Sequence, residues 1–527
     1  MKSLFLYSTS VRQIRHIFNK CFLKSRRNYI AFLIVLLIST QLFSQSKASF
    51  SWSSFEKVNK YSQAVCIFKT EQNYGVIVKY SPNFHNKLSN FDVKIYNKYL
   101  KLEKIKTVVI PKLKEKILEI WNYKNRIYFV TQTDLPNQRI SLRVRIARID
   151  SLEVPLITKD IVVLNVTHFN KNLAFHLIKK DSSVVIWHCN PLEINGSNQS
   201  ISYFNYTNDL KPIDKAIIDL NVKAELCKVL KIEDLESGKF LIYTKEYLTR
   251  QIEKRGFAPN YKFVFYLANS SVDTLKSFTF NDNKVYLQNG RLKIKEGILE
   301  ATGLYTDKTE GPQQGIWYFK YNFNKESLFF DTIQYFDKKV KALPNNGFQS
   351  SVFRKSKIES FYLDYFIKLN SIDRIIIAEQ FLVLPASVGS TYTYNRFYGD
   401  ILLLYLNGKG EIYNSQRLIK AQQTFNNYGE FSSYYLERND SVLNFIFNDH
   451  FKNKEKYQNK HLVWHRQNSL MITSVRENSI TKNLIADYKQ IDGIIQARDM
   501  LKITTNQYLV YAYKKKKGKL GIMKLEN

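Results

Sequence analysis

The chain has 527 residues, enough for a sizeable core and for one large domain or roughly two to three average ones. Its hydrophobic fraction of 44% and charged fraction of 24% are ordinary for a globular protein. The formal net charge of +33 predicts attraction to polyanions such as nucleic acid, acidic glycans or anionic lipid. The lysines are dispersed along the chain and not gathered on one helix face, so we favour a basic, solvated surface over a specific nucleic-acid site.

The segment Tyr29–Phe43 is mainly apolar and follows the basic stretch Lys24–Arg27. A basic n-region, a short apolar run and a polar stop are typical of a secretory signal, and the run is shorter than the ~20 residues a spanning helix needs. We expect residues 1–44 to direct export, with cleavage just before Gln45. The n-region is unusually long, so an uncleaved signal-anchor in the inner membrane is the competing interpretation. Both place the bulk of the chain outside the cytoplasm, in the periplasm, on the cell surface or secreted.

Only three of the four cysteines follow the apolar segment, so they cannot form a fully paired disulfide framework. Their spacing matches no CxxC zinc or redox signature, and a single bridge stays open as an alternative. The four are Cys21, Cys66, Cys189 and Cys227.

Strand signals recur along the whole chain after the export segment. Tyr and Phe number 35 and 36, and aromatic side chains fit a pleated, half-buried surface. Arg139–Ile146 alternates strictly between polar and apolar residues, which predicts a strand with one face on a core and its arginines in water. Helical periodicity is weak and confined to short stretches such as Lys355–Leu369. Further strands are predicted at Val76–Tyr80, Phe91–Tyr96, Ile117–Trp121, Ile127–Thr131, Val184–His188, Phe240–Tyr243, Lys262–Leu267, Gly297–Leu304, Gly315–Tyr321, Ile375–Leu384, Ile401–Leu406, Val442–Phe447, Leu462–His465 and Tyr508–Tyr513.

Short polar links join many of these strands into hairpins. Asn122–Arg126 connects one pair and Asn407–Gly410 another, with glycines where positive φ is expected. Many short strands at near-regular spacing indicate a propeller or stacked sandwiches, although no strict repeat is found. No Pro/Ser-rich linker divides the chain. We therefore predict an all-β fold in which residues 45–527 form one large β-propeller-like array of antiparallel sheets.

Short motifs in the C-terminal half begin with Gly303–Tyr305 followed by Gly315–Tyr318. Others follow at Ala378–Gln380, Tyr394, Tyr398–Ile401, Gly410–Ile412, Ile419–Gln422, Gly429, Ser432–Tyr434 and Phe445–Asp449. Together they resemble a group of uncharacterised, exported proteins of Bacteroidota that look like β-propellers, most strongly over residues 295–450. The group has no activity to carry over, so the resemblance implies fold and export alone.

Three acids in this stretch, Glu379, Asp400 and Asp449, are the first candidates for catalysis. Carboxylate pairs that hydrolyse glycosides are recognised by their spacing in three dimensions, which one sequence does not give. The competing interpretation is that these acids cap turns and accept hydrogen bonds at strand ends. No G-x-S-x-G, Walker A or G-x-G-x-x-G motif is present, and no cofactor is expected.

Two histidine patterns are weak candidates. His461 and His465 could share a strand face, but no HExxH glutamate accompanies them, and we expect an ordinary pair and no metal site. His188 and Cys189 are neighbours on a predicted strand, so their side chains should point to opposite faces and not form a dyad.

A basic run, an aromatic cluster and a tripeptide complete the candidates. Lys514–Lys519 is expected to be a solvated hairpin tip with Gly518 in its turn, in preference to a nucleic-acid site. Tyr392, Tyr394, Phe397 and Tyr398 could stack on sugars or bases, but core packing is the favoured use. Four Asp-Ser/Thr-apolar tripeptides resemble an O-glycosylation pattern of exported Bacteroidota proteins, and they would be modified at Ser151, Thr274, Thr332 and Ser441.

Two functional hypotheses follow. The first is a non-catalytic binding or scaffold propeller of the cell envelope, with a glycan or protein partner and contact with the membrane only through an uncleaved N-terminal segment. The alternative is an envelope hydrolase or lyase that acts on a polyanionic glycan. We favour the first hypothesis, because no catalytic motif is recognisable.

Overall fold

Antiparallel strands make up most of the chain between Ala48 and Glu526, which form one compact unit. The computed structural model describes residues 48–526 with the exception of 59–61, 81–87, 112–114, 137–138, 151–155, 166–174, 180–182, 190–196, 236–238, 250, 257, 270–274, 281–283, 289, 310, 342–359, 371, 389–390, 426–428, 430, 440–441 and 454–467. The predicted signal helix and its cleavage site lie outside these residues. Within the described part of the chain, no helix is both long and apolar enough to cross a membrane.

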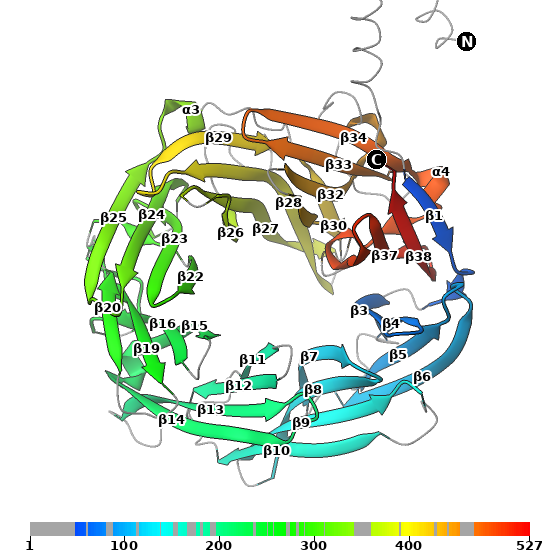
Figure 1. Ribbon diagram of the computed structural model, residues 1–527, viewed down its shortest axis with the longest axis horizontal. Helices are drawn as coiled ribbons and strands as arrows, with labels where there is room; N and C mark the ends of the chain where they lie inside the picture. Colours follow the sequence, from blue (N-terminus) through cyan, green and yellow to red (C-terminus); the bar gives the residue numbers. More distant parts are fainter. Residues whose placement is uncertain are drawn as a thin grey trace, which may run out of the picture. The chain divides into compact units, whose positions relative to one another are not determined.

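The strands form eight sheets of four to six strands, which we call blades 1 to 8 in chain order, and one separate two-stranded sheet. In each blade the chain enters at a strand near the centre of a ring and continues toward the rim (Figure 1). The protein is therefore an eight-bladed β-propeller, which confirms the predicted all-β, propeller-like fold.

Blades 1 to 4 are built by the first half of the chain. Blade 1 contains β3 (Gln63–Lys69), β4 (Tyr74–Tyr80), β5 (Leu88–Tyr96) and β6 (Leu102–Pro111). Blade 2 contains β7 (Glu115–Tyr123), β8 (Arg126–Leu135), β9 (Arg139–Arg148) and β10 (Ile157–Asn165). Blade 3 contains β11 (Phe175–Lys179), β12 (Ser183–Cys189), β13 (Asn198–Thr207) and β14 (Pro212–Lys223), followed by the 3₁₀ turn η1 (Ala224–Leu226). Blade 4 contains β15 (Cys227–Asp234), β16 (Lys239–Tyr247), β19 (Tyr261–Asn269) and β20 (Lys276–Phe280), with the small hairpin β17 (Lys254–Arg255) and β18 (Ala258–Pro259) inserted.

Blades 5 to 8 are built by the second half. Blade 5 contains β21 (Tyr286–Leu287), β22 (Arg291–Lys295), β23 (Ile298–Thr306), β24 (Gln313–Asn322) and β25 (Ser327–Tyr335), followed by α3 (Lys338–Lys341). Blade 6 contains β26 (Phe361–Lys368), β27 (Arg374–Val388), β28 (Thr391–Leu406), β29 (Ile412–Leu418) and β30 (Gln422–Phe425). Blade 7 contains β31 (Tyr435–Asn439), β32 (Val442–His450), η4 (Phe451–Asn453), β33 (Asn468–Arg476) and β34 (Ser479–Asp487), followed by α4 (Tyr488–Ile491). Blade 8 contains β35 (Ile494–Ile495), η6 (Ala497–Asp499), β36 (Leu501–Thr504), β37 (Gln507–Lys514) and β38 (Lys517–Leu525), and it is joined by β1 (Ala48–Trp52) and β2 (Glu56–Lys57).

The two ends of the described chain close the ring. β1 adds to the outer edge of blade 8 by pairing antiparallel with β38, from Ala48 opposite Leu525 to Trp52 opposite Gly521. The last blade is thus completed by the first strand, so blades 8 and 1 cannot separate fully without losing this pairing.

Each junction between neighbouring blades has its own hydrophobic cluster, and the eight clusters follow one another around the ring. At the junction of blades 1 and 2, for example, Phe91 and Phe129 meet edge to face with ring centroids 5.6 Å apart. The last cluster packs Tyr511 of blade 8 against Val76 of blade 1. Both faces of every blade are therefore covered by neighbours.

This covering overturns the expected exposure for two of the three arginines in Arg139–Ile146, while Arg139 is exposed as predicted. The strand itself is confirmed as part of β9, but the Arg143 and Arg145 side chains are only 22% and 11% exposed and lie in ion pairs. A strand with one apolar face would leave its polar face in water only if no second blade lay against it.

Two further expectations are wrong. The helical interpretation of Lys355–Leu369 fails where the structure describes the segment, because Phe361–Lys368 is strand β26. Gly518 does not form the turn of the Lys514–Lys519 hairpin: it lies in β38 opposite Tyr513, while Lys515 takes a left-handed conformation with φ of 55°. The pairing of the two flanking strands is confirmed.

Candidate functional site

One end of the propeller carries the long connections. In a blade of four antiparallel strands, the second-to-third connections and the connections to the next blade lie at the same end. The strands that flank the long stretches 248–260, 336–360, 419–434 and 451–467 end on this side, whereas strands joined by short links such as 124–125 and 477–478 end on the opposite side. We call the first end the long-connection face. Loops on a rigid scaffold commonly carry binding residues, so the buried polar groups beneath this face are the candidate site.

Glu379, the first predicted acid, lies on β27 beneath this face and is 5% exposed. One carboxylate oxygen is 2.5 Å from Lys420 Nζ, and the other accepts a hydrogen bond of 2.7 Å from the Ser433 hydroxyl. Ser433 is held in the left-handed region with φ of 68°, a conformation that costs free energy in a residue other than glycine. Its amide donates to Gln422 Oε1 at 2.8 Å, which helps to hold this conformation.

Asp400, the second predicted acid, is fully buried on β28. Its carboxylate accepts a hydrogen bond from Arg417 Nε at 2.7 Å and another from the Lys420 backbone N–H at 3.1 Å. Its own amide donates to Gln380 Oε1 at 3.3 Å. Glu379 and Asp400 thus both engage Lys420, one through the ammonium and the other through the backbone.

Asp449, the third predicted acid, is fully buried near the end of β32. Lys482 Nζ lies 2.5 Å from one carboxylate oxygen. The other oxygen accepts from the His450 backbone amide at 2.7 Å and from Asn453 Nδ2 at 2.8 Å. Asp449 therefore has its own cation and donors, separate from the network of the other two acids.

A fourth acid, Asp364 on β26, was missed in the sequence. Its carboxylate accepts a hydrogen bond of 2.7 Å from the Tyr434 hydroxyl. Burial, and then the negative charge of Glu379, raise the pKa of Asp364 to about 6, against the opposing effects of Tyr434 and nearby cations. Two carboxyl groups with interacting charges on adjacent strands are a candidate acid–base pair.

Asp364 lies at a β-bulge that recurs in the innermost strand of several blades. The register shifts between Leu363 and Tyr365, so Asp364 is the extra residue of the pair β26–β27. Blades 1, 2 and 4 shift at the equivalent place, and their extra residues are apolar: Val65, Leu118 and Leu230. Blade 6 alone among these four carries a carboxyl group there. Bulges change the direction of side chains and are common beside active sites. An acid at this bulge, where the other three blades have an apolar residue, therefore marks a candidate functional position.

The remaining predicted candidates are not brought into this site. His188 is fully buried on β12, and the neighbouring Cys189 is partly buried. In the described part of the chain, no disulfide joins Cys66, Cys189 and Cys227 to one another. Burial raises the pKa of Cys189 to about 11, which disfavours a thiolate. His461 and His465 lie outside the described residues.

The aromatic and basic candidates are mostly structural. Phe397 and Tyr398 are buried, as core packing predicts, whereas Tyr394 is 48% exposed and the side chain of Tyr392 is outside the description. Of the basic run, Lys519 is buried with its ammonium 4.1 Å from the centroid of the Trp52 ring.

Of the four tripeptide acceptors, only Thr332 is among the described residues. It pairs with Tyr318 inside strand β25 and not at a turn. Ser151, Thr274 and Ser441 lie outside the description, so modification stays a prediction.

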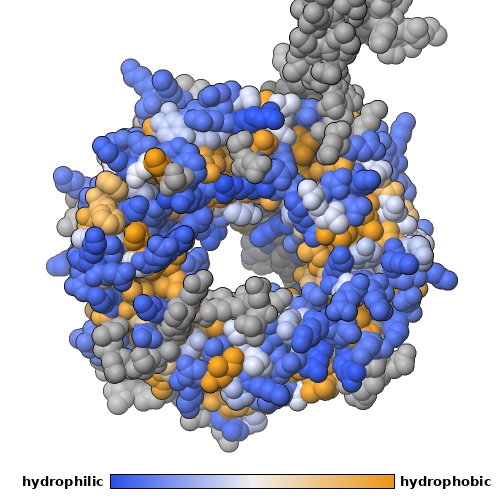
Figure 2. All heavy atoms as spheres, in the orientation of Figure 1, coloured by the Kyte–Doolittle hydropathy of each residue, from blue (hydrophilic) through white to orange (hydrophobic). Residues whose placement is uncertain are grey.

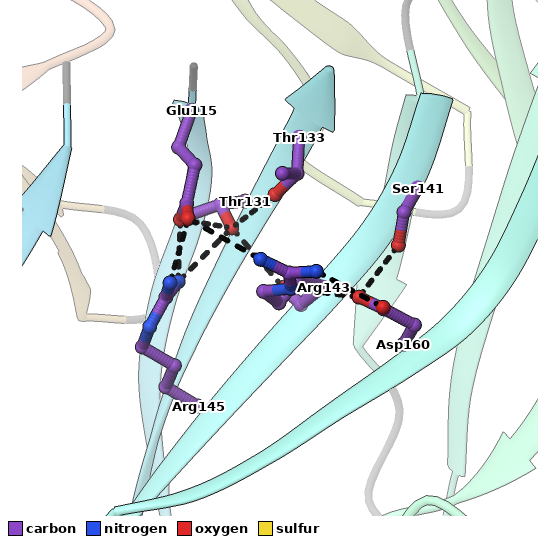
Figure 3. Close-up of polar contacts among 7 residues, drawn as sticks. All are labelled: Glu115, Thr131, Thr133, Ser141, Arg143, Arg145 and Asp160. Carbon is purple, nitrogen blue, oxygen red and sulfur yellow. Dashed lines mark hydrogen bonds and ion pairs between the residues drawn. The ribbon is translucent and has the colours of Figure 1, made fainter. Parts of the chain in front are cut away.

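A second polar network lies on blade 2 and crosses all four of its strands (Figure 3). Arg145 donates two hydrogen bonds to Glu115, at 2.5 and 2.6 Å, and Arg143 donates two to Asp160, at 2.7 and 3.0 Å. The hydrogen bonds from Arg143 hold the pKa of Asp160 below its usual value. Two arginines and two acids balance exactly in formal charge, so this network links strands and offers no surplus charge to a ligand.

A third polar cluster draws side chains from blades 5, 6 and 7, and we call it the inner cation cluster. It comprises five cations around Glu300: Lys293, Lys320, Lys368, Arg374 and Arg438. Arg374 donates two hydrogen bonds to Glu300, at 2.6 and 2.7 Å, and Lys320 Nζ lies 3.4 Å from it. Burial alone would raise the pKa of Glu300, but these cations outweigh it and hold the pKa below its ordinary value.

Three cations of this cluster, Lys293, Lys368 and Arg438, are exposed on the innermost strands β22, β26 and β31. Although Lys293 is exposed, partial desolvation of its ammonium and then the like charges of Arg374, Arg438 and Lys368 lower its pKa. The ring has a central opening whose upper margin in Figure 2 is formed largely by hydrophilic residues. Among the described residues, no group of three or more His, Cys, Asp or Glu side chains is placed to hold a metal ion.

No family model and no curated protein matches this chain. Solved propellers are similar to it at low identity. The WD40 domain of SCAP from fission yeast is 8% identical, with a TM-score of 0.37, and the match covers 91% of this chain and 98% of that one. The propeller domain of the Trilobed protease from Pyrococcus furiosus is also 8% identical, with a TM-score of 0.31 over 80% and 98% of the two chains. The polysaccharide lyase Uly1 is 9% identical, with a TM-score of 0.33 over 77% and 89%. These scores carry no functional argument, and the propeller assignment depends on the sheets described above.

Proposed function

We propose that this protein is an exported, non-catalytic binding propeller that holds a ligand of the cell envelope. The ligand binds to the long-connection face and to the inner wall, which is the surface that the innermost strands form around the central opening. The export signal expected at Tyr29–Phe43 motivates the location, and the resemblance to exported Bacteroidota proteins agrees with it.

The observation that carries this proposal is the state of the three predicted acids. Each of Glu379, Asp400 and Asp449 is paired with its own basic side chain, Lys420, Arg417 or Lys482, and all three acids are buried. A catalytic carboxylate must reach the reacting atoms, whereas a buried ion pair with further hydrogen bonds fixes the position of strands. The geometry therefore favours a structural role for these acids.

The test measures binding and turnover together. Purified protein is incubated with a panel of neutral and acidic oligosaccharides; binding is followed by calorimetry, and chain length by size analysis. We expect binding of at least one class without shortening of any chain. Shortening of a bound oligosaccharide by the wild type, abolished by Glu379→Gln, would refute the non-catalytic proposal.

An envelope hydrolase or lyase is the second candidate, and Asp364 is the observation that favours it. A carboxyl group with a raised pKa beside a second carboxylate is the arrangement of an acid–base pair. If this candidate is right, Asp364→Asn abolishes turnover while the protein still binds. Equal product release by wild type and Asp364→Asn would remove Asp364 from any mechanism.

A further inference from the structure

The exposed members of the inner cation cluster come from three different blades. Lys293 lies on β22 of blade 5, Lys368 on β26 of blade 6, and Arg438 on β31 of blade 7. These strands are innermost in the order of their sheets, and Figure 1 shows β22 and β26 next to the central opening. Arg438 also donates a hydrogen bond of 3.0 Å to the Leu369 carbonyl, which ties blade 7 to the end of β26. The charges are therefore fixed by the rigid part of the blades and not by loops.

The acids at this place do not balance the cations. Glu300 is already bound by Arg374 through two hydrogen bonds and is also close to Lys320. The neighbouring Asp373 adds a second carboxylate near Arg374. Among the described residues, these five cations against two acids leave a formal surplus of three positive charges (5 − 2 = 3). By contrast, the blade 2 network in Figure 3 is neutral.

Exposed aromatic rings lie on the same strand as one of these cations. Tyr362 and Tyr365 on β26 are 60% and 41% exposed, although they belong to the innermost strand of the blade. Exposed rings and a cation on one inner strand together offer flat apolar surfaces to the sugar rings of a chain and charge to its acidic substituents.

We infer that the exposed inner cations Lys293, Lys368 and Arg438, with Tyr362 and Tyr365, bind an acidic polysaccharide whose carboxylate or sulfate groups lie along the inner wall of blades 5 to 7. The inference depends on the proposed binding function and names its ligand class and site. Because the sequence predicts export, we expect this chain to meet acidic glycans outside the cytoplasm and not nucleic acid.

The experiment uses dextran sulfate as the acidic probe, dextran as its uncharged counterpart and oligo(dT) as the nucleic-acid probe. Affinities are measured by calorimetry at about 50 mM and about 300 mM salt, because screening weakens exposed charge contacts. The test variant is K293Q/K368Q, which neutralises two exposed cations of the cluster. The matched control is K101Q/K211Q, which removes the same charge from exposed lysines outside the cluster.

We expect the wild type to bind dextran sulfate and not dextran. K293Q/K368Q should bind dextran sulfate at least about tenfold more weakly at low salt, and K101Q/K211Q within about twofold of the wild type. Charge reversal in K293E/K368E should weaken binding further, and the differences should narrow at high salt. Circular dichroism checks that each variant is folded.

Three outcomes would overturn the inference. Equal losses of affinity for dextran sulfate in the test and control variants would mean that acidic glycans bind elsewhere on the basic surface. The proposed binding function would then remain, but at a different site. Tighter binding of oligo(dT) than of dextran sulfate would replace the glycan with a nucleic acid. Shortening of the dextran sulfate chain would contradict the proposed non-catalytic function itself.

Discussion

Asp400 and Arg417 form the most deeply buried ion pair of the candidate site, with side chains 0% and 4% exposed. Removing one partner of such a pair leaves the other charged and desolvated, which costs more free energy than the pair itself contributes. The pair therefore positions β28 and β29 against each other, and its role can be tested through stability without knowing the ligand.

We predict that Asp400→Asn lowers the free energy of unfolding by about 3 to 5 kcal/mol, because Arg417 keeps its charge without a counter-ion. The control is Asp209→Asn, which removes the partner of Arg126 in an exposed pair of 2.8 Å and should cost less than about 1 kcal/mol. Urea unfolding measures both. Similar small losses in the two variants would show that the Asp400 pair does not hold blade 6 together.

Asp364 gives a pH dependence whose sign is opposite to that of an ordinary ion-paired acid. Its folded-state pKa, about 6, lies above its ordinary value of 3.8, so between these pH values the folded state binds more protons than the unfolded state. Stability therefore falls as pH rises through this range, and the ionised form is a cost at neutral pH.

We predict that Asp364→Asn stabilises the protein at pH 7.5 by about 1 to 2 kcal/mol and changes its stability little at pH 4. The amide can still accept the hydrogen bond from Tyr434. Urea unfolding at both pH values measures the change, with Asp307→Asn as an exposed control. A variant that is less stable than the wild type at pH 7.5 would contradict the raised pKa.

At the scale of strands, ring closure depends on a close approach between β1 and β38. A Cβ atom added to Gly521 would lie 2.2 Å from the Trp52 ring, which is closer than two non-bonded carbon atoms can approach. The Trp52 ring must therefore move away if Gly521 gains a side chain, and Trp52 belongs to the strand that completes blade 8.

We predict that Gly521→Ala lowers the free energy of unfolding by about 1 to 3 kcal/mol, a typical cost of overpacking. Gly311→Ala is the control, because its added Cβ would have only Lys308 within 4 Å, at 3.8 Å. Thermal unfolding of the two variants measures the difference. An unchanged Tm for Gly521→Ala would mean that the closing strand is not tightly packed.

The elements themselves could largely be predicted from the sequence, and the exceptions have physical causes. The alternation in Arg139–Ile146 predicts a strand, but nothing local states that a second blade covers the arginine face. In β26 the buried residues are Phe361, Leu363 and Phe366. The bulge at Asp364 changes the spacing of these buried residues from two positions to three. This spacing resembles a weak helical period, so the sequence predicted neither the strand nor the role of Asp364.

The residues of the proposed binding site were harder to predict, because only the closed ring brings their strands together. The alternation of Arg291, Lys293 and Lys295 with Leu292 and Ile294 is visible in the sequence and could have marked a charged strand. Its position next to Lys368 and Arg438 depends on three blades meeting at the centre. Likewise, the sequence pointed to the three acids, but it could not predict the cations that pair with them, because those cations are distant in the sequence.

At the scale of the whole molecule, the number of blades follows from packing between sheets. Blades take unequal lengths of chain, from the compact blade 1 over Gln63–Pro111 to the long hairpin of blade 6, whose strands β27 and β28 span Arg374–Leu406. This unevenness removes the strict repeat that would reveal eight units in a sequence. The closed ring gives the protein one central wall, and the exposed cations Lys293, Lys368 and Arg438 on that wall are the basis of the inferred acidic-glycan site.

Hydrogen exchange with and without dextran sulfate tests this proposal most directly, since the innermost strands have one edge without a pairing strand and exchange measurably. We predict that the ligand slows exchange in peptides from β22, β26 and β31, while the rim strands β6, β10 and β14 do not change. Protection confined to the rim strands, or none at saturating ligand, would contradict a binding site on the inner wall.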